Sequence, residues 1–191
     1  MAHVTMTYKT SPTRSAIVTT TDLKNFLRVD HSSDDTLIDA LRDVACRWIE
    51  DHCNTKLGDV QFTAFLDGFY SARLPVGQIT SITNVKYKPN GWTTGDALTE
   101  LPSGHQFFDL ESQMARVRWD NAPTVADDEF HTVAITGVVG YPEASVPAPL
   151  IQAVRILVSH LYDNRTAVTI GATPREVPFT VLALCNPYRI Q

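Results

Sequence analysis

Two groups of side chains in this chain are chemically able to hold a metal ion. The first lies within six residues and comprises Asp30, His31, Asp34 and Asp35; the second is His52 with Cys53. Carboxylate, imidazole and thiolate are common ligands of divalent metals. Neither group has a recognised ligand spacing, because the sequence has no HExxH motif and no CxxC pair. Acidic residues also suit the positive end of a helix dipole. We therefore predict a helix start at the first group, a helix end with one buried thiol at the second, and no metal or cofactor. A small metal-dependent hydrolase that uses the first group remains an alternative.

Nucleophilic catalysis and nucleotide binding have no signature in this sequence. It contains no GxSxG motif, no Walker A loop and no GxGxxG loop. His160, Tyr162 and Arg165 lie at the end of a strongly apolar stretch and could form a polar site. We favour a packing role, in which Tyr162 points inward and Arg165 binds the last carbonyls of a helix. The chain is thus predicted not to be an enzyme.

Composition limits the possible partners. The 191 residues carry a net charge of −5, with 43% hydrophobic and 19% charged residues. This is enough apolar material for a core, and the acidic balance argues against a DNA-binding regulator that wraps a phosphate backbone. An acidic wall does suit DNA that must slide past. Three cysteines indicate reduced, buried thiols, and no apolar run is long enough to span a membrane or to act as a signal peptide.

Hydrophobic periodicity predicts helices near both ends of the chain. The expected helices cover about residues 21–28, 33–53, 148–163 and 178–184, after an N-terminal arm over 1–19. Thr20 or Thr21 is the expected cap of the first helix, and Ser32 or Ser33 that of the second. The apolar stripe of the third helix is wide, so this helix should be central and buried on more than one side.

The middle of the chain, about residues 59–141, has the alternation of β-strands. Strands are expected around 60–66, 79–87, 107–110, 114–119 and 131–139, with Asp67-Gly68 as a hairpin-type turn. No helix intervenes, so the sheet should be mainly antiparallel. The predicted fold class is α+β: one domain over 20–191, with a helical core from both chain ends and a β-rich antiparallel insertion.

Trp92 is a candidate contact residue. It follows Asn90-Gly91, which places it at the expected tip of a hairpin. Exposed aromatic residues often mark interfaces. The equally supported alternative is that the Trp92 ring folds back onto the sheet.

Ordered segments along residues 20–191 resemble a known family. The segments are Asp22-Leu23-Lys24 to Asp30, Asp34-Asp35-Thr36-Leu37-Ile38, Trp48-Ile49-Glu50, Leu74-Pro75, Ile79 to Tyr87, Val133 to Gly137 with Gly140-Tyr141, Val146-Pro147, Leu161 to Arg165, Val177-Pro178 and Pro187-Tyr188-Arg189. Each is weak alone, but their order and spacing resemble the head–tail connector (adaptor) proteins of long-tailed phages and gene transfer agents, of the HK97 connector type. Gly77-Gln78 before Ile79 departs from the pattern, as does Cys185.

The resemblance implies a structural protein of the virion neck, present in the host cytoplasm during assembly. Twelve subunits would form a ring beneath the portal, extend the DNA channel without sequence-specific DNA binding, and dock a stopper or tail-completion protein. By this analogy the portal contact is Pro187, Tyr188, Arg189, Ile190 and Gln191, and a subunit or tail-side contact is Asn90, Gly91 and Trp92. The structural alternative is another head-completion component such as a stopper, which two long terminal helices argue against.

Overall fold

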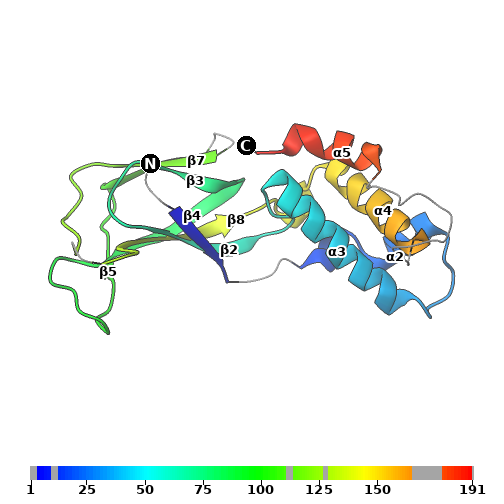
Figure 1. Cartoon of the computed structure of the whole chain (residues 1–191), viewed down its shortest axis with the longest axis horizontal. Coiled ribbons are helices and arrows are strands. Elements are labelled where there is room, and N and C mark those ends of the chain that lie inside the picture. The colour runs from blue at the N-terminus through cyan, green and yellow to red at the C-terminus, as the bar shows by residue number, and fades with distance from the viewer. Residues whose placement is uncertain (1–3, 10–12, 111–113, 127–128, 165–177, 191) are drawn as a thin grey trace, which may run out of the picture. The chain divides into compact units, whose positions relative to one another are not determined.

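The computed structural model describes residues 4–9, 13–110, 114–126, 129–164 and 178–190, and its chain forms two compact units. One unit, here called the β unit, contains Met1–Ser11 and Asp59–Gly140. The other, the helical unit, contains Pro12–Gly58 and Tyr141–Gln191. Helices and antiparallel sheets are both present, so the α+β class is confirmed (Figure 1).

The helical unit is built from the two ends of the chain. Its elements are α1 (Arg14–Ile17), α2 (Thr20–Leu27), α3 (Asp35–Cys53), the 3₁₀ turn η1 (Glu143–Ser145), α4 (Ala148–Asp163), α5 (Phe179–Cys185) and the 3₁₀ turn η2 (Asn186–Tyr188). The four main helices lie within two residues of the predicted bounds. Leu23, Ile38, Ile49, Leu150 and Val158 are among the residues of one buried core, so segments more than 100 residues apart meet in space.

Helix α4 lies at the centre of this unit, as its wide apolar stripe predicted. Leu150, Ala153, Val154, Leu157 and Val158 are buried, and of its 16 residues only Ala148 and Asp163 are exposed. None of the described helices is long and apolar enough to span a membrane.

Both predicted helix caps were wrong. Helix α2 is capped by Thr19, whose side chain accepts from the Asp22 backbone amide while Asp22 reaches back to Thr19. This reciprocal capping box selects Thr19 because an acidic residue stands three positions later. At α3 the N-cap is Asp34 and makes no side-chain capping bond.

Helix α3 buries two of its charged side chains. Glu50 is 1% exposed and Arg42 is 7% exposed, whereas the apolar Val44 is 55% exposed. Glu50 faces Arg14 of α1 and the turn after α3, which cover this side of the helix. The hydrophobic periodicity of one helix does not show which other segments will cover its polar side chains.

The β unit consists of two antiparallel sheets on a shared core. Its strands are β1 (Val4–Tyr8), β2 (Val60–Leu66), β3 (Ala72–Gly77), β4 (Ile79–Tyr87), β5 (Thr99–Glu100), β6 (Gln106–Asp109), β7 (Met114–Trp119) and β8 (Val133–Val139). The first sheet has the order β1-β2-β8-β4-β5 and the second β3-β7-β6. Buried side chains of both sheets, such as Phe62, Ile135, Leu74 and Val117, belong to one hydrophobic cluster.

Three features of the β unit differ from prediction. Residues 4–8 of the expected arm form β1, an edge strand paired with β2. Strand β3 was not predicted. It contains Pro75, which cannot donate a ladder hydrogen bond, but β3 is an edge strand, where proline is tolerated. Asp67-Gly68 does not form a hairpin turn, because it leads from one sheet to the other and neither residue has a positive φ. Asp67 Oδ1 instead accepts a hydrogen bond from the His131 amide.

Candidate interaction surfaces

The acidic group at the start of α3 serves packing. The Tyr162 hydroxyl of α4 donates to Asp34 Oδ2, and Lys24 Nζ of α2 lies 2.7 Å from Asp35 Oδ1. Tyr162 packs on the helical core, as predicted, and Asn164 Nδ2 donates to the His160 carbonyl at 2.7 Å. Arg165, the expected partner of that helix end, lies outside the described residues. Within the described parts of the chain, no three His, Cys, Asp or Glu side chains are grouped to hold a metal ion.

The second group, His52 with Cys53, ends α3 as predicted. The His52 ring stacks on Trp48 with centroids 5.1 Å apart, and Nε2 lies 3.3 Å from Asn186 Oδ1. Cys46, Cys53 and Cys185 are free and buried. Burial raises the pKa of Cys46 to about 12, and a hydrogen bond to Cys185 together with burial raises the pKa of Cys53. The raised pKa values of Cys46 and Cys53 are typical of inert thiols buried in a core.

The C-terminal segment is held against the end of α3. The Ile190 amide donates to the Cys53 carbonyl at 3.1 Å, and the Arg189 amide donates to the Asn186 carbonyl at 3.2 Å. Tyr188 and Ile190 are half-buried, and Tyr188 packs on the helical core. Pro187 and Arg189 are exposed. The segment therefore presents Pro187 and Arg189 on a fixed backbone; Gln191 lies outside the described residues.

The segment between β4 and β5, here called the Trp92 loop, connects these two antiparallel strands. Asn90 and Gly91 are exposed, and Gly91 has φ +81°, a conformation that glycine adopts at no steric cost. Trp92 is half-buried: its Nε1 donates to the Asp96 carbonyl at 3.1 Å, and Lys88 Nζ lies 4.3 Å from the ring centroid. The outcome lies between the two alternatives, since the ring is partly covered within its own loop.

Lys88 also holds a second aromatic residue, which the sequence analysis missed. Its Nζ donates to Glu129 Oε2 and to the Phe130 carbonyl, both at 2.9 Å. Phe130 is nevertheless 80% exposed. The signal that could have identified it is an apolar residue directly after the acidic run Asp127-Asp128-Glu129.

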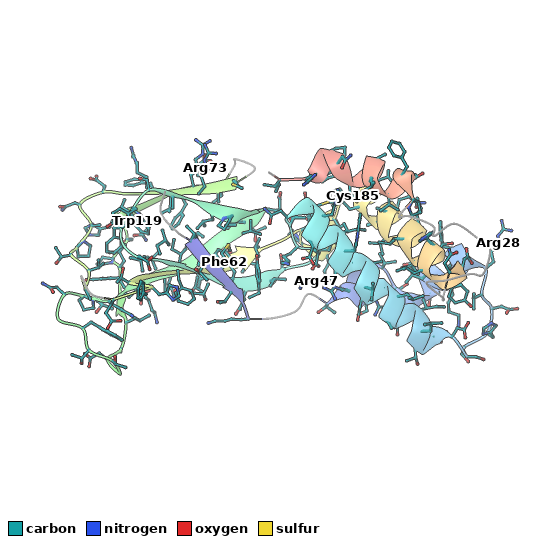
Figure 2. All side chains as sticks on the ribbon, in the orientation of Figure 1. Arg28, Arg47, Phe62, Arg73, Trp119 and Cys185 are labelled. Atoms are coloured by element: carbon teal, nitrogen blue, oxygen red, sulfur yellow. The ribbon has the colours of Figure 1, made fainter. Side chains whose placement is uncertain are left out.

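A basic groove on the outer face of the second sheet was also missed. It has a volume of about 740 Å³, and we call it the arginine groove after its exposed lining residues Arg73, Arg116, Arg118, Phe107 and Asp109. In the strand register, Arg73 of β3 lies opposite Arg116 of β7. On its other side, Arg116 lies opposite Asp109 of β6. Arg118 lies over the Phe107 ring, 5.2 Å from its centroid. Figure 2 shows the Arg73 side chain pointing away from the strands. The alternation of Ala115 and Val117 (buried) with Arg116 and Arg118 could have indicated this face.

Comparisons with known proteins agree with the resemblance found in the sequence. Residues 18–88 match the family model described as phage gp6-like head-tail connector protein. No curated protein matches the chain significantly in sequence.

Solved structures of gene transfer agent (GTA) particles contain chains with the same fold. A chain in the neck of an empty GTA particle, computed with C6 symmetry, has a TM-score of 0.76 and 19% identity over 97% of this chain and 95% of that one. One in the virion of a native GTA particle has a TM-score of 0.76 and 17% identity over 96% and 94%. One in the neck of a native GTA particle, computed with C12 symmetry, has a TM-score of 0.73 and 18% identity over 97% and 94%. The family model thus confirms the resemblance to the connector family over residues 18–88, and the solved structures show a shared fold over nearly the whole chain.

Proposed function

We propose that this chain is a head–tail connector (adaptor) protein, a structural component of the neck of a phage or gene transfer agent particle. The observation that carries the proposal is the near-complete fold match to a chain in the neck of a GTA particle, with 97% of this chain covered. The connector family model over residues 18–88 supports it independently. On this proposal the protein is not an enzyme and requires no cofactor.

The chain acts as one subunit of a closed ring. The similar neck structures were computed with C6 and C12 symmetry, which supports an oligomeric ring. We infer twelve subunits, with residues 20–191 acting as one connector domain and β1 completing its sheet. Cyclic assembly of this kind needs head-to-tail contacts between two different surfaces of each subunit.

The proposed partners are the portal protein on one side and a stopper or tail-completion protein on the other. DNA would pass through the ring without sequence-specific contacts, which the net charge of −5 favours by limiting attraction to phosphate. The protein would lie at the head–tail interface of the virion and pass through the host cytoplasm during assembly. The stopper alternative is less well supported, because α3 and α4 span 19 and 16 residues and stoppers are more purely β.

The C-terminal segment 187–191 is the proposed portal contact. Arg189 is exposed on a backbone fixed by the Ile190–Cys53 hydrogen bond. An ordered backbone lowers the entropy cost of binding, and arginine is enriched among interface anchors. The Trp92 loop, through Asn90, Gly91 and Trp92, is the proposed contact with a neighbouring subunit or the tail side.

The deciding experiment is native mass measurement of the purified protein across a concentration series, alone and with portal rings added. A species of about twelve subunits, alone or on the portal, is the expected result. A tight dimer, or no association in the presence of portal, would refute the proposal.

Substitution of Arg189 by glutamate tests the portal contact separately. We expect Arg189→Glu to weaken portal binding at least tenfold while the fold is retained. The matched control is Arg28→Glu, an equal charge change at another exposed arginine of the helical unit. Unchanged portal binding by Arg189→Glu would remove the C-terminal segment from the contact.

A further inference from the structure

We propose that Phe130 of one subunit docks in the arginine groove of the neighbouring subunit and that this contact closes the ring. The inference rests on the proposed connector function, because it requires a cyclic assembly. Both surfaces belong to the β unit, and neither depends on how the two units are placed relative to each other.

Phe130 is an aromatic side chain that the protein holds out to solvent. Lys88 Nζ binds the Phe130 carbonyl at 2.9 Å, and the next amide, of His131, donates to Asp67 Oδ1 at 2.8 Å. His131 has φ +54°, which is uncommon for a residue with a Cβ atom, and its ring stacks on Phe65 at 4.9 Å. The backbone is thus fixed on both sides while the ring stays 80% exposed. A pre-ordered exposed aromatic residue has the properties of an interface anchor.

The arginine groove presents charges that repel each other in the isolated subunit. Arg73 and Arg116 are direct cross-strand partners, and like charges in that position are destabilising. Arg118 lies two residues further along the same face, and Asp109 is the one acidic residue of the groove. An acidic occupant would relieve the repulsion. Guanidinium groups also stack on aromatic rings, as Arg118 does on Phe107.

The segment that contains Phe130 and precedes β8, here called the Phe130 loop, has the complementary chemistry. In sequence, Phe130 follows three acidic residues, Asp127, Asp128 and Glu129. A groove of about 740 Å³ lies within the size range of ligand pockets, roughly 300–1,000 Å³, so it can admit several side chains. The Glu129 carboxylate would face the arginines, and the Phe130 ring would lie against Phe107 or a guanidinium plane.

Another copy of this chain fits the groove better than DNA does. The β unit carries six basic and ten acidic residues, so three of its six basic residues gather on this one face. The surrounding acidic charge repels a polyanion. The apolar Phe107 beside the arginines suits a mixed acidic and aromatic loop and not a phosphate backbone. The groove is on the second sheet and the Phe130 loop precedes β8 of the first, so the contact joins two different surfaces, as a ring requires.

Photocrosslinking in the assembled ring tests the contact directly. Phe130 is replaced by the photoreactive analogue p-benzoylphenylalanine, and the subunit is mixed with isotope-labelled wild-type chains to identify links between subunits. We expect intersubunit links to the residues that line the groove, 71–73, 107–109 or 116–118. The same analogue at Phe179, which is 82% exposed in the helical unit, is the matched control and should not link to these residues.

Substitution on either side of the contact provides a second readout. We expect Phe130→Ala and Arg116→Glu each to raise the subunit concentration needed for ring formation at least tenfold, with Arg28→Glu close to wild type. If rings form and Phe130 links elsewhere, or if both variants assemble normally, this inference is wrong and the proposed function stands. Salt-sensitive DNA binding that is lost in Arg116→Glu, without crosslinks, would also overturn it. If no ring forms with or without portal, the proposed function fails and the inference fails with it.

Discussion

At the scale of single residues, Glu50 is the buried charge around which the helical unit is organised. Its carboxylate is 1% exposed and lies 3.3 Å from Arg14 Nη2 and 3.8 Å from Lys56 Nζ. The Leu57 amide donates to Glu50 Oε1 at 3.3 Å. The residue therefore connects α1, α3 and the turn after α3, and its charge is compensated from two directions.

Glu50→Gln should lower the free energy of unfolding by about 3 kcal/mol. Removal of the Glu50 charge leaves the buried Lys56 and the half-buried Arg14 without their counter-charge, and breaking a buried pair typically costs about 3–5 kcal/mol. Urea denaturation followed by circular dichroism measures the change. Asp51→Asn is the control, since the exposed Asp51–Arg47 pair should contribute less than about 1 kcal/mol. Equal effects of the two substitutions would contradict the proposed role of Glu50.

Cys46 should make the stability of the protein depend on pH in the alkaline range. Burial raises its pKa from the ordinary 9.0 to about 12 in the folded state. A thiol whose pKa is higher in the folded than in the unfolded state stabilises the fold at pH values below its ordinary pKa of 9.0. This contribution falls as the pH rises from 9 towards 12, by at most about 1.4 kcal/mol for each pH unit.

Comparison with Cys46→Ala isolates this contribution from the titration of lysine and tyrosine. The wild type should lose more free energy of unfolding between pH 8 and pH 10.5 than the variant does. Parallel pH profiles for the two proteins would show that the Cys46 thiol is not protected.

At the scale of elements, the start of α2 depends on its N-cap residue Thr19, which precedes the predicted caps Thr20 and Thr21. Thr19→Ala should destabilise the protein by about 1 kcal/mol, because it removes the capping bond to the Asp22 amide. Thr21→Ala is the control and should have a much smaller effect, since Thr21 is exposed. Thermal or urea unfolding measures the stability of both variants. A larger loss of stability for Thr21→Ala would show that Thr19 is not the cap.

Strand β8 requires a residue without a side chain at position 137. It lies between β2 and β4, and a Cβ atom there would come within 2.4 Å of the Ser81 carbonyl oxygen and 2.9 Å of the Phe62 ring. Gly137→Ala should therefore cost about 3 kcal/mol in unfolding free energy through overpacking. Gly104→Ala, where the space is open and only the φ of +101° is unfavourable, should cost about 1 kcal/mol. A Gly137→Ala protein as stable as wild type would contradict the close approach.

At the scale of the whole molecule, each unit has its own core, and each unit incorporates one end of the chain. The N-terminal strand β1 joins the β unit, and the C-terminal segment closes the helical unit through the Ile190–Cys53 bond. These ends are therefore part of the fold as well as candidate contact surfaces.

Deletion of residues 187–191 should act on both roles. It removes the half-buried Tyr188 and Ile190, so we expect a loss of about 2 kcal/mol in stability together with the loss of portal binding. Arg189→Glu should lose portal binding with little change in stability. Calorimetry and portal pull-down distinguish the two; a truncated protein with wild-type stability would mean that the segment is not a structural brace.

The sequence by itself determined the helices at both ends, the antiparallel strands and the central position of α4, because these follow from the spacing of apolar residues along one element. Tertiary structure decided the features that depend on which segments cover one another. Glu50 is buried because α1 and the following turn enclose it, and Asp67-Gly68 leads between two sheets because β2 pairs with β1 and β8. The exposed Phe130 and the arginine groove likewise arise from pairings across strands distant in sequence. Periodicity reports the two sides of a single element, but burial, charge grouping and exposed aromatic residues are properties of several elements together.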